Sequence, residues 1–148
     1  MQRILAVVFV AACASTVQAQ WDVRTATDPV TDEVVTTGVL IDESGGAALV
    51  VRCINGKLDF VLIASNSTKA WPSFGLAQVT VRWDQEDATE DRVGVSSRDF
   101  YPRNQERYKD KIGKHQRLII RYRTPSSMYT AIWDLSGTLE GLNPYCGL

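Results

Sequence analysis

The sequence has few of the residues on which common catalytic and metal sites depend. Among its 148 residues it has one histidine, His115, and three cysteines. A tetrahedral zinc site needs about four ligands, mainly cysteine and histidine, so this composition argues against one. The chain also has neither a Gly-x-Ser-x-Gly elbow nor a glycine-rich phosphate loop. A Ser–His–Asp triad assembled from distant residues stays open, because the order of its members varies between folds.

Long apolar runs are also scarce. The run Ile4–Ala14 follows the positive charge of Arg3, and Val17–Ala19 places small residues where a signal peptidase reads them. A membrane-spanning helix needs about 20 apolar residues, so we expect residues 1–19 to be a secretory signal peptide. An apolar N-terminal strand is the alternative. No later run is long enough to span a bilayer, so no transmembrane segment is expected after signal removal.

A different processing event is compatible with the same segment. Val10–Cys13 is similar to a bacterial lipobox, in which the cysteine is lipidated and becomes the new N-terminus. The protein is therefore expected to be periplasmic or secreted, with a lipid anchor at Cys13 as the alternative.

Export leaves two cysteines, Cys53 and Cys146, in the mature chain. Two cysteines in an oxidising compartment predict one disulfide, and two buried free thiols are the alternative. The bond would close a loop of roughly 94 residues. The chain-entropy model gives such a loop about 4–5 kcal/mol of stabilisation.

Period-two alternation of apolar and polar residues dominates residues 20–148, which we interpret as a single β-rich domain. Asn55-Gly56 is a strong hairpin signal, because both residues tolerate positive φ. In the later segment QVTVRWD, Trp83 lies at the same parity as the apolar residues before it, so it is expected to face the core. The pattern predicts a mainly β, antiparallel β-sandwich or open barrel. Six strands are expected, within the segments EVVTTGVLID, ALVVRC, KLDFVLIA, QVTVRWD, RLIIRYR and YTAIWDLS.

One polar segment, Tyr101–Lys114, breaks the alternation and predicts one short amphipathic helix, since Phe100, Tyr108 and Ile112 share a helical face. Pro102 suits its first turn and Gly113 its end. A second short turn is expected at residues 139–143, before Pro144.

The hairpin strands also suggest an interface. Leu58, Phe60 and Leu62 share one face in the expected pattern, so Val61 and Ile63 would point outward together with Val50. These outward apolar residues would mark the interface of a purely structural subunit.

Charge is unevenly distributed along the chain. Residues 98–123 carry nine basic and three acidic side chains, whereas residues 20–97 carry six basic and twelve acidic ones. Such a basic helix and strand would attract an anionic partner; an ordinary solvated face is the alternative. In an exported protein the partner would be an envelope protein or an anionic envelope polymer rather than nucleic acid. The candidate residues are Arg107, Lys111, Lys114, Arg117, Arg121 and Arg123.

Other segments carry weaker signals. Trp71 lies in a loop and could serve as an aromatic binding platform or cap the fold. His115 is expected to be a solvated loop residue, and a cleft near it and Trp71 defines the alternative function, a small secreted hydrolase or hydrolase inhibitor. The acidic stretch Asp84–Asp91 lacks the central glycine of a calcium loop and is interpreted as a solvated turn. Asn66–Thr68 fits a glycosylation sequon. No metal or other cofactor is expected.

The order of these features resembles the TagO/VasI-like envelope proteins associated with bacterial type VI secretion, and similar exported bacterial proteins. The pieces that carry the likeness are Trp21, "DPVTDE", "LVVRC", "VTVRWD", "KIGKHQRLIIRYR" and "AIWDLSGTLEGLNPYC". The resemblance implies a small periplasmic β-rich accessory protein, with no catalytic residues to carry over. We therefore expect an exported, non-catalytic binding or accessory protein of the cell envelope.

Overall fold

A computed structural model describes residues 21–65, 74–96, 99–123, 127–136 and 139–147. It is mainly β, as predicted, with nine strands and two short helices. The elements are β1 (Asp22–Thr27), β2 (Val34–Ile41), β3 (Ala47–Ile54), β4 (Lys57–Ser65), β5 (Phe74–Trp83), β6 (Thr89–Ser96), β7 (Asp99–Pro102), α1 (Gln105–Ile112), β8 (Arg117–Arg123), β9 (Met128–Asp134) and α2 (Leu139–Cys146).

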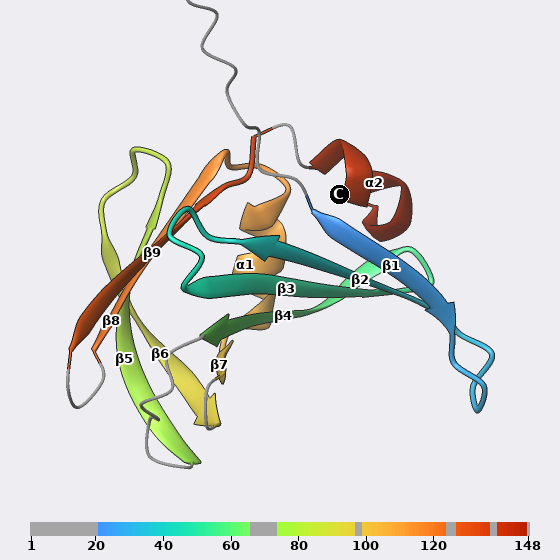
Figure 1. Cartoon of the computed structure of the whole chain (residues 1–148), viewed down its shortest axis with the longest axis horizontal. Helices are drawn as coiled ribbons and strands as arrows, with labels where there is room; N and C mark the ends of the chain where they lie inside the picture. Colours follow the sequence, from blue (N-terminus) through green and yellow to red (C-terminus); the bar gives the residue numbers. More distant parts are fainter. Residues whose placement is uncertain (1–20, 66–73, 97–98, 124–126, 137–138, 148) are drawn as a thin grey trace, which may run out of the picture.

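The strands form one antiparallel sheet of order β1-β2-β3-β4-β7-β6-β5-β8-β9. Two residue pairs, Ile63–Phe100 and Ala64–Asp99, are the only ones that connect β4 to β7 among the residues described. This narrow seam divides the sheet into a β1–β4 half and a second half that curls into a half-barrel (Figure 1). The β2–β3 turn of the first half approaches the edge strand β9 of the second, where Glu43 N donates to Ile132 O at 2.9 Å. The fold is therefore close to the open barrel that the alternation predicts.

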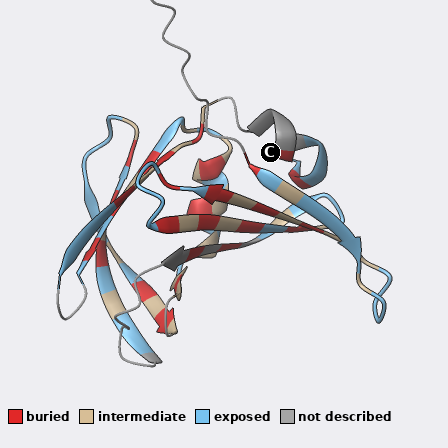
Figure 2. Cartoon of the chain, viewed as in Figure 1, coloured by how far each residue is buried: buried red, intermediate tan, exposed pale blue. Residues whose placement is uncertain are grey.

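Both helices pack on the core face of the sheet. Tyr108 and Ile112 of α1 are fully buried, and the Tyr108 ring meets the edge of Trp83 at 5.7 Å between ring centroids. Leu142 of α2 is buried at the other end of the core. Buried and exposed residues alternate along the strands (Figure 2), so one face of the sheet forms the core and the other faces solvent.

The β3–β4 hairpin confirms the predicted turn and corrects the predicted strand faces. Asn55 and Gly56 have φ of 49° and 80°. The pairing shifts register after Arg52, which faces Phe60, while Cys53 faces Leu58. The residue between Phe60 and Leu58 is a β-bulge, and a bulge reverses which residues face the core. Val61 and Ile63 are therefore fully buried, and the prediction that they point outward was wrong.

Both helix predictions need new boundaries. Pro102 ends β7 instead of opening α1, and Asn104 caps the helix, with its Oδ1 accepting from Arg107 N at 3.2 Å. Gly113 is the C-cap, as expected. The C-terminal helix continues through Pro144 to Cys146. Three further strands, β1, β6 and β7, were not predicted.

The disulfide joins Cys53 and Cys146, whose Cα atoms lie 5.3 Å apart. Both cysteines are buried, at 1% and 2% exposure. The bond fastens the end of α2 to the strand that opens the hairpin. Residues 1–19, including Cys13, lie outside the described residues, as do Asn66–Thr68 and Trp71.

We expect Cys146→Ser to lower the free energy of unfolding by about 4 kcal/mol, because the loop spans 93 residues. Urea unfolding with and without reductant measures this difference. The double variant Cys53→Ser/Cys146→Ser is the control and should not respond to reductant. Equal stability of the unmodified protein in both conditions would contradict the structural role of the bond.

A close contact between α2 and β2 yields a second test of the core. A Cβ on Gly38 would lie 2.6 Å from Cδ1 of Leu142 and 3.1 Å from the Trp21 ring. We expect Gly38→Ala to destabilise the fold by about 1–3 kcal/mol, because it overpacks the contact. Gly75→Ala, with nothing within 4 Å of its Cβ, is the matched control. Equal melting temperatures of the two variants would show that α2 is not packed against Gly38.

Candidate functional site

The solvent face of the half-barrel carries exposed arginines. Along β8, the buried residues Leu118, Ile120 and Tyr122 alternate with the exposed Arg121 and Arg123. Because successive strand residues point to opposite faces, the core fixes these two arginines on the convex surface. Among the elements that the structure describes, no helix covers them, since both helices pack on the core face.

The strand register adds two arginines that the sequence analysis did not include. Thr80 of β5 faces Arg121, so Arg82, two residues further along, lies on the same face. Gln78 of β5 faces Arg92 of β6. All four side chains are exposed. We call the set Arg82, Arg92, Arg121 and Arg123 the arginine face.

The arginine face is not neutralised by ion pairs within the described residues. Arg82 donates to the neutral Gln85 Oε1 at 3.3 Å. Glu90 is an acid on the same face, and it accepts from the amide of Gln78. Adjacent strands lie about 4.8 Å apart, so arginines on β6 and β8 are separated by about 10 Å. Their guanidinium groups are suited to binding several anionic groups at once.

Of the remaining predicted cations, Arg117 shares the convex face of β8 by the same alternation but has an acidic partner, and the others lie on or just after α1. Lys111 forms an ion pair with Glu86, and Arg117 lies 3.5 Å from Glu43. Arg107 donates to Thr89 Oγ1 at 3.0 Å, while Lys114 is exposed in the turn after α1. The helix cations therefore do not form one surface with those of β8, and of the predicted set only Arg121 and Arg123 lie on the convex face without an ion pair among the described residues.

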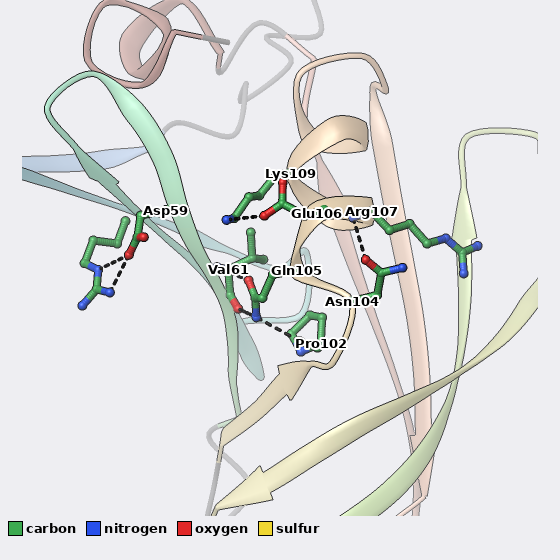
Figure 3. Close-up of polar contacts among 9 residues, drawn as sticks. Asp59, Val61, Pro102, Asn104, Gln105, Glu106, Arg107 and Lys109 are labelled. Carbon is green, nitrogen blue, oxygen red and sulfur yellow. Dashed lines mark hydrogen bonds and ion pairs between the residues drawn. The ribbon is translucent and has the colours of Figure 1, made fainter.

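The position of α1 explains this separation. Gln105 donates to Val61 O and Pro102 O at 3.0 Å each, and its Oε1 accepts from Val61 N at 2.8 Å (Figure 3). These bonds hold the helix against β4 and β7, on the core side of the sheet. Lys109 pairs with Glu106 at 2.9 Å on the helix itself.

A hollow of about 540 Å³ adjoins the arginine face where the edge of β6 meets the start of α1. Its lining includes Arg92, Arg103 and Asn104 together with Glu90 and Asp91. At its side, burial together with the nearby Asp91 carboxylate raises the pKa of Tyr108. Tyr108 is thus a neutral core residue. The hollow has as many acidic as basic side chains in its lining, so it does not extend the basic surface.

His115 is held in a polar cluster and is not the solvated loop residue that the sequence suggests. Its side chain is 17% exposed, and its Nδ1 lies 3.0 Å from Oδ2 of Asp84. Its Nε2 lies 3.6 Å from Oε1 of Glu86. The ring also packs against Trp83, with 5.5 Å between centroids.

Asp84 joins two segments of the chain. Its Oδ1 accepts from Gln116 N at 2.9 Å and from Arg117 N at 2.7 Å. Burial alone would raise the pKa of Asp84, but hydrogen bonds from Arg117, His115 and Gln116 together hold it below its usual value. The cluster thus ties the β5–β6 turn to the start of β8. The hydrogen bonds from His115, Gln116 and Arg117 to Asp84 therefore form a structural clamp.

The acidic stretch Asp84–Asp91 is only in part the solvated turn that was expected, because β6 begins at Thr89. A hydrogen bond from Lys111 is the main cause that lowers the pKa of Glu86.

Within the part of the chain that the structure describes, no group of three or more histidine, cysteine or acidic residues is arranged to hold a metal ion.

Comparison of the chain with protein-family models, with curated proteins and with solved structures finds no significant match. The likeness to TagO/VasI-like proteins therefore rests on the sequence segments quoted above and stays a prediction.

The Asp84 clamp predicts an acid-sensitive part of the stability. A carboxyl group whose pKa is lowered by folding stabilises the fold above its ordinary value of 3.8, and that stabilisation is lost as the pH falls through the lowered pKa. Asp84→Asn keeps an oxygen for Gln116 N and Arg117 N but removes the charge. We expect its stability to fall less steeply than that of the unmodified protein below pH 3.8.

Thermal unfolding across this pH range measures the effect. Asp87→Asn is the matched control, since Asp87 is an exposed acid of the same turn, and it should follow the unmodified protein. Parallel pH curves for Asp84→Asn and the unmodified protein would show that the clamp does not depend on charge.

Proposed function

We propose that the protein is an exported, non-catalytic binding or accessory protein of the bacterial cell envelope, and that it engages an anionic partner through the arginine face. The observation that carries this proposal is the alignment of Arg82, Arg92, Arg121 and Arg123 on one exposed surface. The partner is an envelope protein or an anionic envelope polymer.

The spacing of the charges favours a partner with several anionic groups. The four arginines are spread over three strands, and those on β6 and β8 are separated by about 10 Å across β5, so a single phosphate or carboxylate leaves part of the face uncontacted. A chain or surface with repeated anionic groups can instead contact each guanidinium in turn, with bidentate hydrogen bonds. Because these charges are exposed, binding should weaken as salt is added.

Export is supported by the segment before residue 20 and by the Cys53–Cys146 disulfide, since such bonds persist in oxidising compartments. Among the described residues, no helix has the length and apolar character to cross a bilayer. The resemblance to TagO/VasI-like proteins adds a type VI secretion context to this proposal.

The alternative of a hydrolase or hydrolase inhibitor depends on a cleft near Trp71 and His115. Trp71 lies outside the described residues, and Asp84 and Glu86 flank the His115 ring. We therefore favour the binding function.

The proposal predicts that the triple variant Arg92→Glu/Arg121→Glu/Arg123→Glu loses most of its binding to isolated bacterial envelope fractions. The reason is that repulsion replaces attraction at the contact. Co-sedimentation at low and at high salt measures the bound fraction, and the salt dependence should be much weaker for the variant.

A matched control reverses three exposed cations elsewhere, Arg24, Lys57 and Lys114. It has the same net charge as the test variant, so any difference between the two reflects the location of the charges. Equal losses of binding in both variants would show that only the net charge of the protein matters. That result would overturn the arginine face as the binding surface.

A further inference from the structure

β9 is an edge strand that is only partly covered. It pairs with β8 along its whole length, from Arg117–Asp134 to Arg123–Met128. On its other side, the end of β2 and the turn after it cover only the second half of the strand. There Glu43 N donates to Ile132 O at 2.9 Å, and the Trp133 indole donates to Leu40 O at 3.1 Å.

The Glu43 bond shows which backbone groups of β9 point away from β8. Ile132 O points outward, and in an antiparallel pair every second residue directs both backbone groups to the same side. Thr130 and Met128 therefore also present their N–H and C=O groups outward. Within the described residues, no hydrogen bond satisfies these outward groups.

The two edges of the sheet differ in charge. The other edge strand, β1, carries Asp22 and Arg24, which form an ion pair at 3.0 Å. Charges on an edge discourage pairing with another strand. β9 has no charged residue from Met128 to Trp133, so its free half lacks this protection.

The side chains next to the free edge indicate what it binds. Thr130 faces Arg121 and Met128 faces Arg123 across the β8–β9 ladder. A strand added beside β9 would lie about 10 Å from β8, within reach of the long arginine side chains over the small Thr130. Acidic side chains on the convex face of that strand would meet these cations.

We propose that the free edge of β9 binds an extended acidic segment of a partner protein as an added antiparallel strand. Its backbone pairs with Met128 and Thr130, and its acidic side chains contact Arg121 and Arg123. This inference rests on the proposed function and names the partner class, a protein strand with acids at alternate positions. Main-chain bonds supply the docking geometry, and the arginines select for acidic side chains.

The pairing geometry gives a sharp test with peptides. The residue directly opposite Thr130 shares its convex face and points its own N–H toward β9. The probe is a short synthetic peptide in which glutamate alternates with threonine. N-methylation of its glutamates removes the pairing donors and keeps every charge, whereas N-methylation of its threonines alters groups that point away from β9.

We expect N-methylated glutamates to weaken binding at least tenfold and N-methylated threonines to change it little, as measured by titration calorimetry or fluorescence anisotropy on the whole mature chain. A peptide with glutamine in place of glutamate should also bind at least tenfold more weakly. Equal affinity of the two N-methylated peptides, or of the glutamine peptide and the parent, would overturn the proposal.

Variants of the protein give an independent measurement. Thr130→Pro removes an outward N–H without removing a bond to β8, and proline is tolerated on edge strands. It should weaken binding of the parent peptide about three- to tenfold, as expected for lost backbone hydrogen bonds, whereas Thr130→Ala should not. Melting temperatures establish that both variants are folded.

The outcomes separate the two proposals. If Arg121→Ala/Arg123→Ala weakens binding while Thr130→Pro and both N-methylated peptides behave like their parents, strand pairing is overturned and the arginine face remains. If the arginine variant binds both the peptide and envelope fractions as well as the unmodified protein, the proposed function itself fails.

Discussion

Burial of one face of a single sheet is the constraint on which the rest of this structure depends. Every strand of the curved half places alternate residues, such as Val81, Trp83 and Ile120, in the core. The residues between them are consequently forced onto the convex surface. Core packing therefore determines where the arginine face lies. It does not determine that these residues are arginines, because many other polar residues at the same four positions would be compatible with the fold.

Core packing, the Asp84 clamp and the disulfide fix the positions of the strands that carry this surface. The seam between β4 and β7 comprises two residue pairs in the described part of the chain, so the halves depend on other links across the core. α1 bridges them through Gln105 and Tyr108. Trp133 donates to Leu40 O of β2, Ile132 O accepts from Glu43 N of the β2–β3 turn, and Asp84 fixes the start of β8. The bond from Cys53 to Cys146 adds a constraint on the unfolded chain. The candidate site thus lies on strands whose relative positions are fixed.

Sequence patterns predicted the fold class, the Asn55-Gly56 turn, the disulfide and the core position of Trp83, because each depends on local periodicity or on chain-wide composition. They missed what depends on pairing between distant segments. The β-bulge opposite Arg52 reversed the faces of Val61 and Ile63. Arg82 and Arg92 joined the site only through the register of β5 with its neighbours, while Lys111 and Arg117 were neutralised by acids distant in sequence. The His115 clamp was missed for the same reason.

The central claim is that the convex surface of β5, β6 and β8 binds anions. Its most direct test is an NMR titration of the isotope-labelled mature protein with polyglutamate, with the guanidinium and backbone amide signals of each arginine assigned. The account predicts shifts concentrated at Arg82, Arg92, Arg121 and Arg123 that disappear at high salt. Shifts spread evenly over all exposed cations, or concentrated at Lys109, Lys111 and Lys114 around α1, would contradict it.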